Sequence, residues 1–244
     1  MPAIPSALAP VGADPAETLS ARLAAIAAEF RHVAFASSLG AEDMVLTDAI
    51  LRAGLPITIF TLDTGRLHRE TLALLDRIHD RYGYALEVFR PDPAELERYV
   101  SSYGLNAFYE SVELRKRCCQ LRKVEPLARA LAGRDAWITG QRRQQSVTRT
   151  HLGLREHDRV HHIAKFNPLA DWHATEVWAY IRQRSVPYNS LHDRGYPSIG
   201  CEPCTRAVRP GEDERAGRWW WESRDSKECG LHVAPPNPNE GNRP

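Results

Sequence analysis

The sequence predicts an α/β fold in which a mostly parallel sheet carries helices on both faces. Short apolar runs with the length of buried strands alternate with longer segments in which apolar residues recur at helical spacing. Small and hydroxylated residues form the turns within several of these pairs. Such alternation is typical of parallel sheets. With 244 residues the chain can bury one substantial core, so a single domain with appendages is expected.

The first half of the chain contains an initial helix and three strand–helix pairs. A proline-rich stretch over residues 1–16 indicates a flexible leader, and the pattern at 17–30 predicts the initial helix. The three pairs are 32–36 with 41–52, 57–62 with a helix that ends at Arg81, and 86–89 with a helix that follows Pro91. The ends of such strands are where a parallel sheet places its ligands.

The second half of the chain alternates less regularly. A helical pattern at 124–131 leads into an apolar run at 136–140, which is a fourth candidate strand. Tryptophans at roughly helical spacing predict a further helix after Asp171. The α/β domain should therefore extend over residues 17–194.

The C-terminal part of the chain differs in composition from the rest. Residues 195–232 are rich in glycine, proline and cysteine and show little periodicity. They predict a loop-rich segment that is held by something other than a large core of its own. Residues 233–244, with several prolines, are expected to form a disordered tail.

Charge and hydropathy exclude several classes of partner. Lys and Arg total 32 against 31 Asp and Glu, so the formal charge of +1 gives no field that would favour nucleic acid or a membrane surface. No apolar run approaches the roughly 18 residues that a membrane span requires. The N-terminus also lacks the basic-then-apolar order of a secretory signal. A cytoplasmic protein with neither nucleic acid nor membrane as a partner is expected.

Four of the five cysteines form two pairs. Cys118 and Cys119 are adjacent, and Cys201 and Cys204 form a C-x-x-C pair much further along the chain. A reducing compartment disfavours disulfides, so metal binding is the better interpretation for these clustered residues. Zinc is one candidate, but adjacent cysteines strain to meet a single ion, whereas each thiolate of a cubane binds a different iron. An iron–sulfur cluster is therefore favoured over zinc.

Basic residues surround the adjacent pair of cysteines. An apolar niche does not suit such surroundings, which weakens the alternative that these two cysteines are merely buried apolar side chains. A run of this kind is usually a solvated helix face, but Lys123 is also a candidate for contact with thiolates or with an anionic substrate. The basic residues are Arg115, Lys116, Arg117, Arg122 and Lys123.

Cys229, the fifth cysteine, has no neighbouring cysteine and is available for chemistry. Only the thiolate is a competent nucleophile, so this residue must meet positive charge in the folded protein. The negative charge of Glu228 disfavours the thiolate of Cys229. Positive charge from Lys227, His232 or a basic nucleotide site could offset this effect. Taken alone, a single cysteine near a C-terminus is more often incidental than catalytic.

The turn after the first predicted strand is suited to an anion. Free backbone N–H groups and a helix dipole can bind an anion where this turn meets the following helix, and the turn contains Ser37, Ser38, Gly40 and Asp43. The alternative is that the two serines only cap the helix. The turn lacks the Gly-Lys-Ser/Thr of a P-loop, and its acidic residues would repel a triphosphate. A nucleotide with fewer phosphate charges fits better.

Two later strand ends add candidate contacts at the same edge of the sheet. Thr64, in an Asp-Thr-Gly turn, could contact base or ribose, and its alternative is an ordinary turn. Gly140 and Arg142 follow the fourth candidate strand and supply a tight turn and a cation. The sequence therefore predicts one nucleotide site that several strand ends share.

Taken together, these motifs resemble the assimilatory sulfonucleotide reductases, from about residue 30 to residue 232. The Glu-Cys-Gly-Leu-His ending at 228–232 is highly specific to that family, and adjacent cysteines with a distant C-x-x-C mark its branch with a [4Fe-4S] cluster. The motifs that carry the resemblance are 37–46, 61–65, 118–119, 140–149, 165–169 and 228–232.

The resemblance implies a fold, an activity and a set of partners. The fold is a single adenine-nucleotide-hydrolase-like domain, in which the altered serine-rich turn speaks against ATP hydrolysis. The iron–sulfur branch takes adenosine 5'-phosphosulfate (APS) and reduces it to sulfite and AMP for cysteine biosynthesis, with thioredoxin or a similar dithiol protein as donor. A homo-oligomer is one possible assembly. The alternatives are the 3'-phosphorylated substrate (PAPS), or a non-catalytic iron–sulfur nucleotide sensor.

The resemblance also implies roles for individual residues. Cys229 corresponds to the nucleophile that forms an S-sulfocysteine, and His232 would lie close to the substrate. Arg215 and Arg218 would approach the phosphate and sulfate, and their alternative is a solvated arginine pair beside core tryptophans. The serine-rich turn would hold the nucleotide. The ligands of the [4Fe-4S] cluster would be Cys118, Cys119, Cys201 and Cys204.

Overall fold

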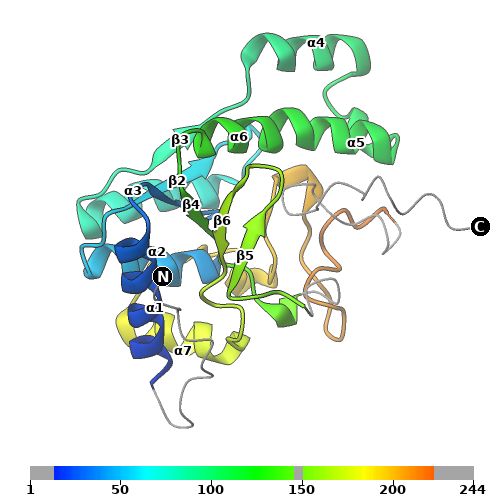
Figure 1. The fold of residues 1–244 in the computed structure, drawn as a ribbon. Helices are drawn as coiled ribbons and strands as arrows, with labels where there is room; N and C mark the ends of the chain where they lie inside the picture. The colour runs from blue at the N-terminus through cyan, green and yellow to red at the C-terminus, as the bar shows by residue number, and fades with distance from the viewer. Residues whose placement is uncertain (1–13, 146–150, 223–244) are drawn as a thin grey trace, which may run out of the picture.

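The computed structural model describes residues 14–145 and 151–222, which build a six-stranded sheet in the order β3-β2-β1-β4-β6-β5 (Figure 1). All strands run parallel except β5, which is antiparallel to β6. The strands are β1 Val33–Ala36, β2 Ile57–Leu62, β3 Glu87–Phe89, β4 Ala136–Ile138, β5 Arg155–Asp158 and β6 Ile163–Phe166. The predicted α/β fold with a mostly parallel sheet is confirmed.

Helices connect β1 to β2, β2 to β3 and β3 to β4, as is usual between strands of a parallel sheet. The α-helices of the described ranges are α1 Pro15–Glu29, α2 Ala41–Arg52, α3 Arg69–Tyr82, α4 Pro93–Tyr103, α5 Val112–Cys119, α6 Glu125–Leu131 and α7 Ala174–Arg184. A π-helical turn, Gln120–Val124, joins α5 to α6. Such turns are rare and frequently occur at functional sites.

The sheet is covered on both faces. Val33 and Phe35 of β1 face a large core that α1, α2, α3 and α7 complete, whereas Ala34 between them faces a smaller core formed with α6. Figure 1 shows α1, α2 and α7 on one side of the sheet and α6 on the other. Burial on both faces explains why the central strands appear in the sequence as continuous apolar runs.

Two features differ from the sequence-based expectation. Helix α1 begins at Pro15, inside the expected leader, because Asp14 caps it by accepting the Ala16 N–H at 2.9 Å and proline is favourable in the first turn. The β5–β6 hairpin was not predicted. Its outer strand, Arg155–Asp158, is a half-exposed edge of polar residues and carries no apolar run.

The described part of the expected C-terminal segment packs against the α/β domain and has little regular secondary structure. Residues 195–222 contain a single 3-10 turn, Glu202–Cys204. Isolated bridges join Leu67 to Cys201 and Thr205 to Arg218. This segment is thereby held against the loop that follows β2. None of the helices in the described ranges has the length and apolar character to cross a membrane.

Candidate active site

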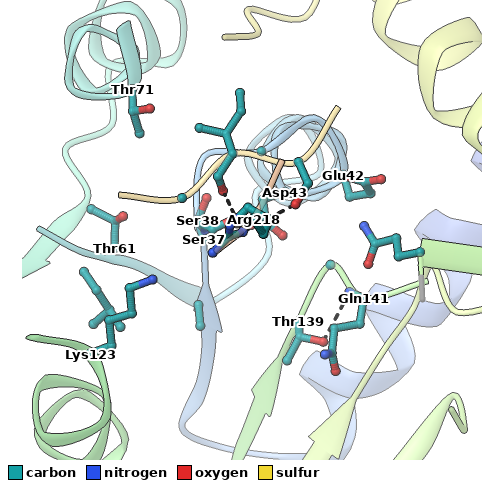
Figure 2. A pocket seen from close by; sticks show the side chains of 18 of the residues that line it. Ser37, Ser38, Glu42, Asp43, Thr61, Thr71, Lys123, Thr139, Gln141 and Arg218 are labelled. Atoms are coloured by element: carbon teal, nitrogen blue, oxygen red, sulfur yellow. Dashed lines mark hydrogen bonds between the residues drawn. The ribbon is translucent and has the colours of Figure 1, made fainter. Parts of the chain in front are cut away.

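A cavity with a volume of about 230 Å³ lies at the carboxyl ends of β1, β2 and β4. Ser37 and Ser38 follow β1, Thr64 follows β2, and Gly140 follows β4. Figure 2 shows Ser37, Ser38 and Arg218 together near its centre, with Lys123 on one side and Gln141 on the other. The strand ends therefore meet at one site, as expected for a parallel sheet.

The turn after β1 is held by the carboxylate of Asp43, which lies in the first turn of α2. Asp43 Oδ2 accepts hydrogen bonds from the Ser38 N–H at 2.6 Å and the Ser38 hydroxyl at 2.5 Å. Leu39 adopts a left-handed backbone with φ of 61°, and Gly40 caps α2 without a side-chain hydrogen bond. Burial raises the pKa of Asp43 to about 6, against the hydrogen bonds from Ser38, which lower it. Asp43 thus shapes the turn whose two serines line the cavity.

Gly140 allows the loop after β4 to approach this turn. A Cβ atom there would lie 2.0 Å from Asp43 Oδ1 and 3.2 Å from the Cβ of Glu42, so only glycine fits. The next residue, Gln141, is buried and lines the cavity, and its Oε1 atom has no hydrogen-bond partner among the described residues. An unsatisfied buried acceptor favours a ligand that donates a hydrogen bond.

The Arg142 side chain binds two carboxylates and does not line the cavity. Its guanidinium is 3% exposed and binds Glu42 at 2.8 Å and Glu214 at 3.8 Å. It is not among the residues that line the cavity in the described structure. Arg142 therefore ties the start of α2 to the chain directly before Arg215.

Three basic side chains, Lys123, Arg215 and Arg218, line the cavity. Arg218 is buried, lies 4.7 Å from the ring centre of Trp219, and its Nε has no hydrogen-bond partner in the described part of the chain. Gly200 makes room for it, since a Cβ there would approach within 2.4 Å of the guanidinium. This buried charge is well placed to bind an anionic group of a ligand.

The four paired cysteines surround a second, smaller cavity of about 20 Å³. Cys118 and Cys119 end α5, and Cys201 and Cys204 flank the 3-10 turn. The folded chain thereby brings both pairs to one place. The other residues around this cavity are Arg66, Phe108, Arg115, Arg122, Lys123, Pro203 and Trp219.

Burial raises the pKa of two of these thiols, which favours their neutral form in the absence of a metal. Burial raises the pKa of the Cys118 thiol. Burial, followed by the charge of Cys201, raises the pKa of Cys204 to about 12. A metal group is the partner that makes buried thiolates stable. Over the described ranges, no three or more His, Cys, Asp or Glu side chains are grouped to hold one metal ion.

Thr64, which lines the larger cavity, makes a polar contact with one of the four cysteine sulfur atoms. Thr64 Oγ1 lies 3.2 Å from Cys201 Sγ, and the Arg122 guanidinium donates to the Thr64 carbonyl at 2.6 Å. Lys123 and Trp219 line both cavities. The two sites therefore share a wall, and Lys123 can act electrostatically on both.

Most of the candidate residues come together in the described structure. The residues that line the larger cavity are Ser37, Ser38, Gly40, Asp43, Thr64, Lys123, Gly140, Arg215 and Arg218. Cys118, Cys119, Cys201 and Cys204 line the smaller one. Cys229 and His232 lie outside the described residues.

His192, which no sequence motif predicts, lines the larger cavity from the 3-10 turn His192–Arg194. Both of its ring nitrogens are buried without a hydrogen-bond partner of normal geometry within the described chain. Burial lowers its pKa, against the nearby Glu42 carboxylate, so the imidazole is neutral near pH 7. No local motif marks this residue, because the neighbours that bury it come from distant parts of the chain.

Comparison with known proteins shows a consistent likeness. Residues 32–207 match the sequence model of the "Phosphoadenosine phosphosulfate reductase domain". The adenosine 5'-phosphosulfate reductase of Burkholderia cepacia is 62% identical over 237 residues, which cover 97% of this chain and 95% of that protein. The enzyme of the same name from Allochromatium vinosum is 58% identical over 86% of this chain and 82% of its own.

Solved structures agree with the fold. The phosphoadenylyl-sulfate (PAPS) reductase of Candida auris, solved as a phosphate complex, is 30% identical with a TM-score of 0.66 over 81% of this chain and 92% of its own. The FMN adenylyltransferase of Candida glabrata is 13% identical with a TM-score of 0.54 over 84% of this chain and 71% of its own. At this identity the second likeness concerns the fold alone.

Proposed function

Because the chain belongs to the phosphoadenosine phosphosulfate reductase family, we propose that it reduces APS to sulfite and AMP with electrons from a thioredoxin-like dithiol protein. The observation that carries this proposal is a cavity at the strand ends that Lys123, Arg215 and Arg218 line, next to a smaller cavity that four cysteines line. Relatives of the same length carry the name adenosine 5'-phosphosulfate reductase.

In the proposed reaction, the Cys229 thiolate attacks the sulfur of the sulfate group. The bond between that sulfur and the bridging oxygen breaks, and AMP leaves with the electron pair, so an S-sulfocysteine forms. A thiolate of the dithiol protein then attacks the Cys229 sulfur and expels sulfite. The second thiol of the donor resolves the mixed disulfide, and the donor ends as a disulfide after giving two electrons.

The cations of the cavity compensate the charge that grows on the departing phosphate. Lys123, Arg215 and Arg218 are the side chains available for this on the described structure. Arg218 is buried and held by contacts within the protein before the reaction, so it needs little rearrangement as charge develops. We assign Ser37, Ser38 and Gly40 to the nucleotide phosphate, since they line the cavity beside the start of α2.

The four cysteines around the smaller cavity fit an iron–sulfur cluster. Both pairs line one small cavity, and basic side chains line it with them. We propose that Cys118, Cys119, Cys201 and Cys204 hold a [4Fe-4S] cluster. When bound, it supplies a fixed charge that orients Lys123 and its neighbours, and both reducing equivalents come from the dithiol. We expect the reaction in the cytoplasm, where thiols stay reduced.

The substrate is tested by comparing APS with PAPS under the same conditions. With thioredoxin present, we expect sulfite and AMP in equal amounts and kcat/KM higher for APS. The carboxylates of Glu42, Asp43 and Glu214 line the cavity and oppose a further phosphate. A preference for PAPS would contradict the substrate assignment, and binding of either nucleotide without sulfite release would support a sensor instead.

A further inference from the structure

A buried ion pair joins α5, the helix that ends in two of the cysteines, to Glu222, the last residue that the structure describes. Arg115 Nε donates to Glu222 Oε1 at 2.9 Å, and Arg115 Nη2 donates to Glu222 Oε2 at 2.9 Å. The two side chains are 1% and 4% exposed. This is a bidentate arrangement, the strongest geometry that an arginine and a carboxylate can adopt.

Arg115 lies on the same face of α5 as the cysteines. It precedes Cys118 and Cys119 by one helical turn, lines the smaller cavity, and lies within hydrogen-bond reach of the Cys119 sulfur. Its guanidinium also stacks on Trp219, 4.8 Å from the ring centre. Arg218, which lines the nucleotide cavity, lies 4.7 Å from the same ring. Contacts thus run without a break from Glu222 to the wall of the nucleotide cavity.

Glu222 is the last described residue, and Cys229 follows it seven positions later in the sequence. Its backbone N–H donates to the Trp219 carbonyl at 2.9 Å, so the backbone and the side chain are both fixed. Trp219 has a left-handed backbone with φ of 40°, which is unusual for a bulky residue and persists only when the surroundings enforce it. The position of Glu222 is therefore tightly determined.

We propose that the Arg115–Glu222 ion pair is a positioning device for the nucleophile: it fixes where the segment carrying Cys229 starts, relative to the four cysteines and to the bound substrate. The proposal rests on the proposed function, because it takes Cys229 to be the group that accepts the sulfonate. A buried pair of this kind is weak evidence for stability by itself. Glu222 precedes Cys229 by only seven positions in the sequence, so the role that we assign to the pair is to position the nucleophile.

The test uses Glu222→Gln, which keeps the size of the side chain and removes its charge. The holoprotein is purified without oxygen and mixed with APS in the absence of a dithiol donor, and sulfonation of Cys229 is followed by mass spectrometry of quenched samples. We expect the rate to fall by at least about tenfold, because a displacement of about 1 Å can cost up to about 100-fold in rate. AMP affinity and iron content should stay within about twofold of the wild type, since Glu222 lines neither cavity.

A matched control is Glu212→Gln, which breaks the half-exposed pair with Arg206 in the same C-terminal segment. We expect it to leave the sulfonation rate unchanged, since exposed pairs contribute little. Glu222→Asp restores the carboxylate one methylene short and should recover part of the rate. Wild-type sulfonation in Glu222→Gln would overturn the proposal. Loss of iron or AMP binding together with the rate would also overturn it, because the pair would then be merely structural.

These outcomes separate the positioning role from the proposed function. If wild-type protein is not sulfonated by APS, the proposed function fails whatever the variants do. If the wild type is sulfonated and Cys229→Ser is not, the function stands, and Glu222→Gln then decides the positioning role alone.

Discussion

Asp43 is a buried carboxylate whose hydrogen bonds serve the turn that faces the nucleotide cavity. It accepts two hydrogen bonds from Ser38, and the loop at Gly140 packs against it. Burial favours its neutral form more than these contacts favour the charged form, so its pKa rises to about 6 from the usual 3.8. The geometry of the site is thus linked to pH through this single group.

The raised pKa of Asp43 predicts a defined pH dependence of stability. Between pH 3.8 and about 6 the folded state keeps a proton that the unfolded state has released. Its stabilising contribution is therefore complete below this window and is lost as pH rises through it, by an amount on the order of 3 kcal/mol. Asp43→Asn should remove this slope. Urea unfolding from pH 4 to pH 7 measures it, and parallel pH profiles for wild type and variant would contradict the assignment.

Gly140→Ala is predicted to disrupt the nucleotide site. The new Cβ would lie 2.0 Å from Asp43 Oδ1, so the loop after β4 must move away from the turn after β1. We expect AMP affinity to fall at least about tenfold, or about 1.4 kcal/mol, in isothermal titration calorimetry. Gly211→Ala is the control: φ there is 86° and the space is open, so it should cost about 1 kcal/mol of stability without changing AMP affinity. Equal losses in both variants would refute the steric argument.

At the scale of the elements, a buried carboxylate connects three helices under the sheet. Asp48 of α2 accepts hydrogen bonds from Tyr82 of α3 at 2.8 Å and from Tyr180 of α7 at 2.9 Å. Burial raises the pKa of both tyrosines, so both hydroxyls remain donors at any ordinary pH. These contacts fix the helices that support the carboxyl ends of β1 and β2.

Asp48→Ala should destabilise the protein more than either tyrosine substitution. It leaves two buried hydroxyls without their acceptor, at a cost of about 3 kcal/mol, whereas Tyr82→Phe or Tyr180→Phe removes one hydrogen bond at about 1 kcal/mol. Chemical denaturation at pH 7 compares the three variants. If Asp48→Ala were no less stable than Tyr82→Phe, the carboxylate would not be the centre of this network.

The sequence predicts elements best where burial on both faces makes a strand a continuous apolar run, as at Ile57–Leu62. The hairpin β5–β6 could not be predicted in this way, because half-exposed polar strands carry little periodic signal. The cysteine pairs and the turns after β1 and β4 could be located from local motifs. His192, Gln141 and the Arg115–Glu222 pair could not, because their role depends on which distant side chains bury them.

At the scale of the whole molecule, the four cysteines connect the α/β domain to the segment 195–222. Cys118 and Cys119 belong to α5, whereas Cys201 and Cys204 belong to that segment, which has only one short 3-10 turn in its described part. A shared metal group would hold the segment more firmly than its small apolar contacts can. The metal site is thus expected to stabilise the wall of the nucleotide cavity that carries Arg215 and Arg218.

Removal of the metal is therefore predicted to loosen this segment. Cys204→Ser should lose iron, and amide hydrogen exchange within 195–222 should become at least about tenfold faster, whereas β1 and β2 stay protected. AMP affinity should fall in parallel. Cys229→Ser provides the control, with full iron and unchanged exchange. An iron-free Cys204→Ser protein with wild-type protection would show that the metal does not hold the segment.

The central claim is that the sulfonate passes through Cys229 while the other four cysteines remain occupied by metal. The measurement that tests it most directly is peptide mapping by mass spectrometry after anaerobic mixing with APS alone. The account predicts one sulfonate per chain, on the peptide that contains Cys229, together with an equal amount of AMP and undiminished iron. A sulfonate on Cys118, Cys119, Cys201 or Cys204, or AMP release without any covalent sulfonate, would contradict it.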